Sequence, residues 1–356
     1  MVWKESQGES LNMKLIIKWV VGLIIIYSGL LWLIEFLRRR MKRGRVTILC
    51  YHRVLDDGQI KDYYRPAIAV SVSVFRKQMK MLQERYNIIS LEDAVSLLGK
   101  KKPLEKDYIV ITFDDGYMDN YKNAFPALKE CNLPSTIFLA TDYINSNRLL
   151  WTDEVGMLLE EKWDVFLQTE LFRTLKDIGI SDNKAILINE IISILKKMDE
   201  DTRNAIIARL KENIGHSVEM DALMLTWEQI REMMAGGISF GGHTMSHRFL
   251  TMLTPSVKEI EISKSKDIVE QNLKERVLCF AYPDGRFDKE CKDIAQKCGF
   301  YGACSMITGD NMPGCNLFAL KRRDIEESAC IDPFGRASKT LFLMEMSGIY
   351  DIFRRG

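Results

Sequence analysis

Two histidines in this 356-residue chain have a spacing that suits a metal site. His243 and His247 stand four residues apart, and on a helix or in a tight loop this spacing can turn both imidazoles toward one point. Neutral imidazole is a common ligand of zinc and of similar divalent metals. Two histidines alone are equally typical of a polar surface loop, so the metal interpretation requires a third ligand elsewhere in the chain.

Two adjacent carboxylates supply that ligand. Asp114 and Asp115 directly follow the apolar run at residues 108–113, which predicts a buried strand. Carboxylates at the end of such a strand are costly unless another charge compensates them. Taken alone, the pair is more typical of a turn or a helix N-terminus formed with Gly116. Together with the histidines it completes an Asp–His–His ligand set and leaves one carboxylate for acid–base chemistry.

The segments around these residues alternate between strand-like and helix-like patterns. Apolar, β-prone runs predict strands at residues 46–50, 108–113, 135–140, 237–240, 277–282 and 301–305. Helical spacing of apolar residues predicts helices from residue 73, at 254–273 and 291–298, and from residue 339 onward. This alternation predicts an α/β fold with parallel strands, in which functional residues gather at the carboxyl ends of strands.

The stretch from about residue 149 to about 221 has a different character. It contains no glycine or proline between Gly179 and Gly215, and its apolar residues recur at helical spacing. We interpret it as a helical insertion that shapes or covers the substrate site. His216 lies in it without partners, and we interpret this histidine as structural.

Three segments resemble motifs of the polysaccharide deacetylase family, also called carbohydrate esterase family four. Residues 112–117 read TFDDGY, residues 243–247 read HTMSH and residues 280–285 read FAYPDG, in the family's order. The similarity runs from about residue 46 to the C-terminus and is interrupted by the helical insertion. It implies an α/β fold, namely a distorted (β/α) barrel of about seven strands.

The resemblance also implies roles for the motif residues. Asp115, His243 and His247 would bind a divalent metal ion, with zinc the expected metal, and Asp114 would be the general base. Three protein ligands leave coordination positions open for water and for the substrate carbonyl oxygen, as a catalytic site requires.

A general acid is also needed to protonate the leaving amine. The family's usual late Leu-x-x-His motif is absent, because no histidine follows His247. Residues 51–54, YHRV, resemble the branch that deacetylates poly-N-acetylglucosamine, in which the acid histidine comes from the N-terminal strand. The resemblance to this branch implies His52 as the acid. The alternative is a chain without catalysis.

The third motif departs from the family at Ala281, where the wider family has an arginine. Arg323, in the run KRRDI at residues 321–325, resembles a late arginine motif of the same branch and is assigned as an orienting partner for the base. A solvated basic run is the equally typical alternative. Residues assigned to substrate binding by the third motif are Tyr282, Pro283 and Asp284.

The N-terminal region contains an apolar segment at residues 15–37, without any charge at residues 19–34. A helix of that length would extend about 34 Å, enough to cross a hydrocarbon core of about 30 Å. A basic segment at 38–45 follows it in place of a small-residue cleavage site, which favours a retained single-pass anchor over a signal peptide. The expected organisation is a tail at 1–14, the transmembrane anchor, the basic juxtamembrane segment and a catalytic domain at 46–356.

Two features of the sequence disagree about which side of the membrane the catalytic domain occupies. The basic segment after the anchor places the catalytic domain in the cytoplasm by the positive-inside rule, whereas the family resemblance favours an extracytoplasmic polymer substrate.

The 50 basic and 49 acidic residues balance, and no basic patch is interleaved with aromatics, so no nucleic-acid partner is expected. None of the eight cysteines forms a CxxC pair, which argues against a zinc ribbon.

The expected function is the hydrolytic, metal-dependent removal of an N-acetyl group from an amino-sugar of a glycan. One alternative is a deformylase or deacetylase of a lipid-linked amino-sugar at the membrane. Another is a membrane-tethered, glycan-binding homologue without catalysis. An intact Asp114, which binding alone would not need, argues against the last. The oligomeric state is not specified by the sequence.

Overall fold

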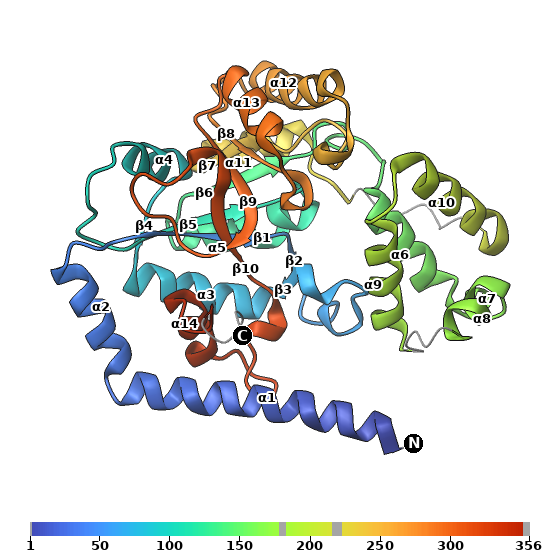
Figure 1. Cartoon of the computed structure of the whole chain (residues 1–356), viewed down its shortest axis with the longest axis horizontal. Helices are drawn as coiled ribbons and strands as arrows, with labels where there is room; N and C mark the ends of the chain where they lie inside the picture. Colours follow the sequence, from blue (N-terminus) through green and yellow to red (C-terminus); the bar gives the residue numbers. More distant parts are fainter. Residues whose placement is uncertain (1, 178–182, 216–222, 352–356) are drawn as a thin grey trace.

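The computed structural model describes residues 2–177, 183–215 and 223–351, and a closed barrel of parallel strands lies at its centre (Figure 1). The barrel strands are β1 (Val46–Tyr51), β5 (Tyr108–Phe113), β6 (Ser135–Leu139), β7 (Ile238–Gly242), β8 (Cys279–Ala281), β9 (Gly302–Thr308) and β10 (Leu320–Asp324). Their order around the barrel is β1-β10-β9-β8-β7-β6-β5, and β5 closes it by pairing with β1. The predicted (β/α) barrel of seven strands is confirmed.

Helices pack around the outside of this barrel. They are α3 (Val72–Arg85), α4 (Leu91–Gly99), α5 (Phe125–Glu130), α11 (Trp227–Ala235), α12 (Pro255–Leu273), α13 (Lys289–Lys297) and α14 (Lys339–Ser347). Every residue of β1 and of β6 is buried, as expected for parallel strands covered on both faces. A short strand, β4 (Asn87–Ile88), pairs with the start of β5, and β2 (Arg53–Leu55) pairs with β3 (Ala69–Ser71) beside the barrel.

Strand β10 was missed by the sequence patterns, because its residues, LKRRD, look like a solvated basic run. Both of its arginines are fully buried. The strand pairs in parallel with β1, where Arg322 stands opposite Ile48 and Asp324 stands opposite Cys50. It is therefore the barrel's link between its last strands and its first one.

The segment expected to be a helical insertion contains five helices that form a bundle beside the barrel, at the right of Figure 1. These are α6 (Trp151–Glu161), α7 (Trp163–Phe166), α8 (Glu170–Asp177), α9 (Lys184–Leu195) and α10 (Glu200–Ile214). The bundle has an apolar core of its own, which includes Phe166, Leu187 and Leu210. Residues 178–182 and 216–222, with His216, lie outside the described part.

The N-terminal region forms two helices, α1 (Val2–Tyr27) and α2 (Leu30–Arg40), with a sharp bend between them (Figure 1). Among the described residues, no single helix is long and apolar enough to cross a bilayer. The stretches Met13–Tyr27 and Leu30–Arg38 meet those criteria only as a pair, and their axes are bent by 65°. The structure thus does not confirm the transmembrane helix expected at residues 15–37.

Candidate active site

The three expected metal ligands meet at the carboxyl end of the barrel. Asp115 follows β5, whereas His243 and His247 lie in the loop after β7. Asp115 Oδ1 is 3.3 Å from His243 Nε2 and 3.1 Å from His247 Nε2. One donor atom from each residue lies within 4.8 Å of the other two. The structure therefore brings together one carboxylate and two imidazoles, which are a typical donor set for a zinc-like ion.

Several residues at and between these ligands have strained backbone conformations. Asp115 has φ of 75° and His247 has φ of 56°, and Thr244 between the two histidines has φ of 63°. Residues other than glycine seldom adopt this left-handed region, and such conformations gather at functional sites. The two histidines are thus presented by an irregular loop rather than by a helix.

A carboxylate from the following helix fixes the middle of the loop that carries the two histidines. Glu261 of α12 accepts hydrogen bonds from the backbone N–H groups of Met245 and Ser246, at 2.9 and 3.0 Å, and from the Ser246 hydroxyl at 2.5 Å. Glu261 is buried. Because these bonds lie between the two histidines in the chain, they restrain the direction of both imidazoles.

The protonation of the first histidine also suits a metal ligand. His243 Nδ1 lies 2.8 Å from the carbonyl oxygen of Ala281, and a carbonyl only accepts, so Nδ1 must carry the proton. In the neutral imidazole the lone pair is then on Nε2, the nitrogen that faces Asp115, as in metal-binding histidines whose other nitrogen is held by the protein. Asp115 Oδ1 itself is buried and receives no well-aligned hydrogen bond. A buried, unsatisfied carboxylate oxygen facing two imidazoles fits a bound cation.

The second carboxylate, Asp114, is paired with a buried arginine. Arg322 Nη1 donates to Asp114 Oδ1 and Arg322 Nη2 donates to Asp114 Oδ2, both at 2.7 Å. The guanidinium is itself held by the Ser305 carbonyl, which accepts from Nε at 2.9 Å. Burial by itself raises the pKa of Asp114, but the charge and hydrogen bonds of Arg322, together with the nearby His243 and His52, outweigh it and lower this pKa to about 2. Asp114 is therefore ionised at neutral pH.

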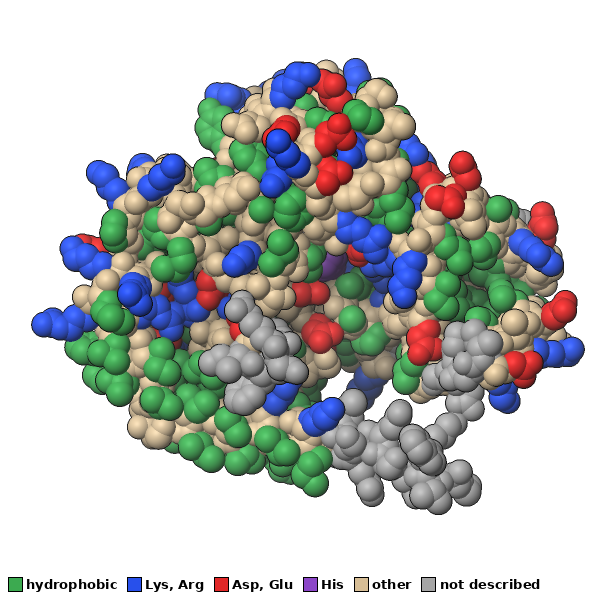
Figure 2. Space-filling view, viewed as in Figure 1, with side chains coloured by type: hydrophobic (Ala, Val, Ile, Leu, Met, Phe, Trp, Pro, Cys, Tyr) green, Lys and Arg blue, Asp and Glu red, His purple; other side chains and the backbone are tan. Residues whose placement is uncertain are grey.

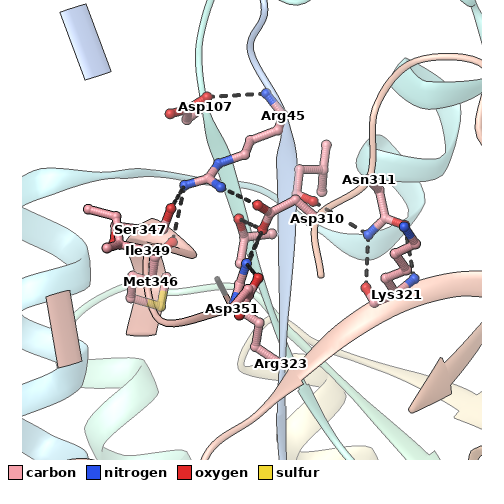
Figure 3. A network of polar contacts seen from close by, with 12 residues as sticks. Arg45, Asp107, Asp310, Asn311, Lys321, Arg323, Met346, Ser347, Ile349 and Asp351 are labelled. Carbon is pink, nitrogen blue, oxygen red and sulfur yellow. Dashed lines mark hydrogen bonds and ion pairs between the residues drawn. The ribbon is translucent and has the colours of Figure 1, made fainter. Parts of the chain in front are cut away.

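The arginine assigned to this role from the sequence was the wrong one. Arg323 does not contact Asp114; it pairs with Asp310 at 3.2 Å and with Asp351 at 2.8 Å, in a network that also holds Arg45 (Figure 3). Consecutive residues of a strand point to opposite faces, so of the two adjacent arginines only Arg322 can reach the site from β10. The charge that Ala281 cannot supply thus comes from Arg322.

The proposed acid, His52, also lies at this end of the barrel. Its Nε2 is 4.0 Å from Asp114 Oδ2, and its Nδ1 is 3.9 Å from Asp324 Oδ1. Asn120 fixes the backbone here by donating to the His52 carbonyl at 2.8 Å. Neither distance from the ring is a formed hydrogen bond, and catalytic contacts often shorten only when substrate binds. Asp324, which sequence reasoning missed, is placed to orient this imidazole.

A cavity of about 140 Å³ is lined by the candidate metal ligands, by both possible proton-transfer groups and by Asp324. The insertion contributes Thr152 and Lys196 to its wall, and Lys196 forms an ion pair with Asp284. Of the three residues assigned to substrate binding, Asp284 alone is among those that line the cavity. The Tyr282 hydroxyl instead donates to the Phe318 carbonyl at 3.1 Å. Tyr282 and Pro283 are buried, and neither lines the cavity.

Replacing Arg322 with methionine is expected to destabilise the fold and to shift the pH dependence of activity. Removing one partner of a buried ion pair leaves an uncompensated charge and costs about 3–5 kcal/mol. Without Arg322, burial raises the pKa of Asp114, so the acidic limb of the pH–rate profile should move to higher pH. Chemical denaturation and pH–rate profiles measure the two effects.

The neighbouring arginine is the matched control for this experiment. Arg323→Met also removes a buried arginine from its carboxylate partners, so it should destabilise the protein. It should leave the acidic limb where it is, because Arg323 does not touch Asp114. Equal shifts in both variants, or none in Arg322→Met, would contradict the pairing.

Comparison with known proteins places this site in a family context. The sequence model of the family described as polysaccharide deacetylase matches residues 101–303. The chain is 24% identical over 296 residues to YxkH of Bacillus subtilis (strain 168), which bears a provisional polysaccharide deacetylase name, and the match covers 83% of this chain and 76% of YxkH. It is 23% identical over 251 residues to the poly-beta-1,6-N-acetyl-D-glucosamine N-deacetylase of Staphylococcus epidermidis, covering 66% of this chain and 84% of that protein.

Solved structures share the fold. The Streptococcus pyogenes deacetylase PplD, solved with acetate, has a TM-score of 0.54 at 21% identity, covering 82% of this chain and 96% of PplD. IcaB from Ammonifex degensii has a TM-score of 0.53 at 20% identity, covering 80% of this chain and 94% of IcaB. At these identities the likeness extends to the fold alone.

Proposed function

Because the chain belongs to the polysaccharide deacetylase family, we propose that it removes N-acetyl groups from an amino-sugar glycan with the help of a divalent metal ion. As a member of this family it is a hydrolase of carbon–nitrogen bonds other than peptide bonds. The amino-sugar substrate is supported by the S. epidermidis relative, which is named for the deacetylation of poly-N-acetyl-D-glucosamine.

One observation carries the proposal. A possible metal-ligand set, an ionised carboxylate and a separate imidazole border a single cavity, and their residues follow the ends of three barrel strands, β1, β5 and β7. Hydrolysis of an amide needs these three functions together: stabilisation of the oxyanion, a base for the attacking water and an acid for the leaving amine.

The ligands of the metal would be Asp115, His243 and His247, and zinc is the metal we expect. When bound, the ion would polarise the acyl carbonyl and lower the pKa of water. The buried Asp115 carboxylate would contribute one negative charge, and both imidazoles would bind in their neutral form.

Asp114 and His52 would carry out the proton transfers. Asp114 would accept a proton from the attacking water, because Arg322 keeps it ionised and the carboxylate retains lone pairs beyond the two that the guanidinium occupies. His52 would donate a proton to the amine nitrogen as the carbon–nitrogen bond breaks. Asp324 would orient the imidazole. The products would be acetate and a free amino-sugar.

We expect the purified full-length chain, supplied with zinc, to release acetate from β-1,6-linked N-acetylglucosamine oligomers with one free amine formed per acetate. Enzymatic detection of acetate and amine labelling measure the two products. The matched control is Asp114→Asn, which keeps the shape of the side chain but cannot accept the proton. Glycan binding without any acetate or formate release by the wild-type chain would favour a non-catalytic homologue. Release only from lipid-linked amino-sugars would replace the polymer as substrate.

A further inference from the structure

The outer surface of α1 and α2 is a continuous apolar band. Figure 2 shows apolar side chains gathered along these helices at the lower edge of the molecule. The large exposed side chains of the band are Val20, Ile24, Tyr27, Leu30, Trp32, Leu33, Phe36 and Leu37. Glu35 is the one acidic residue between positions 19 and 37, and it is turned inward, 3.6 Å from Arg85. An apolar surface of this extent marks an interaction site on a protein.

The inner surface of α1 packs closely against the barrel and its surrounding helices, which are called the catalytic body, or the body, below. The Tyr350 hydroxyl donates to the Lys18 carbonyl at 2.7 Å, and the Trp19 ring meets Phe334 edge-on at 5.7 Å. Gly22 makes the approach possible, because a Cβ there would lie 2.8 Å from Thr340 Cγ2. Leu31 of α2 is 2% exposed. Both helices thus have one face committed to the body and one face left uncovered.

A helix that crosses a bilayer while the body stays in water would have to give up this packing. Crossing would pull α1 away from α14 and leave the hydrogen bond between the Tyr350 hydroxyl and the Lys18 carbonyl unformed. It would also require the two helices to straighten, whereas they are bent by 65° and follow the surface of the body. The same two-faced geometry is what a helix lying in the plane of a membrane interface requires.

Exposed cations border the apolar band at both ends. Lys14 and Lys18 precede it, and Arg40 and Arg43 follow it. Basic side chains beside an apolar helix face are attracted to anionic headgroups. Trp32 and Tyr27 within the band are of the residue types that gather at the headgroup level. The chemistry of the uncovered surface therefore matches an anionic lipid surface.

We propose that α1 and α2 bind an anionic bilayer in its plane, with the outer apolar band in the headgroup–acyl boundary and the inner face holding the catalytic body. The N-terminus and the catalytic domain then lie on the same side of the membrane. The basic segment after the band contacts headgroups on that side, so it no longer reports which way a spanning helix is oriented.

Flotation of the full-length protein with vesicles tests the lipid surface. The protein should float with vesicles of phosphatidylcholine and phosphatidylglycerol, and the double variant Ile24→Glu, Trp32→Glu should bind at least about tenfold more weakly, because two apolar side chains are lost from the interface. Ile260→Glu, which alters an exposed isoleucine on α12, should bind like the wild type. A double variant that still floats, or a wild-type chain that does not, would overturn the proposal.

Protease access distinguishes lying in the plane from spanning. In sealed membrane vesicles that carry the full chain with an N-terminal and a C-terminal tag, a protease added outside should remove both tags or neither. If one tag is removed and the other survives until detergent is added, the chain spans the bilayer and the in-plane arrangement is wrong.

Discussion

Replacing Asp115 with asparagine is expected to abolish metal binding and deacetylation together. The substitution keeps the volume of the side chain but removes the negative charge from the oxygen that faces both imidazoles. Without the ion, turnover should fall by at least the roughly 10²–10³-fold that one oxyanion-stabilising group contributes. Metal content by mass spectrometry and acetate release should decline in parallel.

A second aspartate near the histidine loop controls for this change. Asp142 lies beside the loop, its backbone N–H donating to the Met245 carbonyl at 2.9 Å, but its carboxylate faces Arg148 rather than the ligands. Asp142→Asn should keep both metal and activity. Exhaustive chelation of the wild type should reproduce the Asp115→Asn phenotype, and added zinc should reverse it. Full activity after chelation would refute the metal assignment.

Replacing His52 with alanine is expected to reduce amide hydrolysis by roughly 10²–10⁴-fold, the loss typical of a missing general acid, with metal content unchanged. His52 is not part of the Asp–His–His set, and its imidazole lies 4.0 Å from Asp114 Oδ2. Steady-state acetate release from N-acetylglucosamine oligomers, together with metal analysis of the same sample, measures the effect.

A substrate with a different leaving group distinguishes a general-acid role of His52 from a merely structural one. An aryl acetate ester releases a phenolate that departs without a proton, so His52→Ala should hydrolyse it at nearly the wild-type rate. Asp114→Asn should lose the ester and the amide alike, because both reactions need the base. An equal loss on both substrates in His52→Ala would indicate that His52 supports the fold of the site and does not donate the proton.

The positions of Asp115, His243 and His247 could be anticipated from the sequence because each motif directly follows an apolar run. In a parallel barrel the strands run in one direction, so residues that follow them meet at one end whatever lies between them in the chain. The roughly 130 residues between Asp115 and His243, insertion included, therefore did not obscure the site.

The arginine that pairs with Asp114 could not be predicted from the sequence in the same way. The two arginines at positions 322 and 323 are identical in type and adjacent, and a run of basic residues is ordinarily solvated. Which one faces Asp114 depends on the register of β10 against β1, and the burial of both depends on carboxylates distant in the chain. Neither the register of the strand nor the burial of the arginines can be predicted from the local sequence.

The sequence by itself determined the candidate site residues at the strand ends and an apolar N-terminal segment. Tertiary structure decided which arginine holds Asp114, that Tyr282 does not line the cavity, and which face of the N-terminal segment packs against the rest of the chain. Hydropathy sums the apolar residues of 15–37, but it does not record that some of them are buried against α14 while others face outward. That division arises from packing between segments about 320 residues apart, because a helix can bury a face only against a surface that the rest of the chain has built.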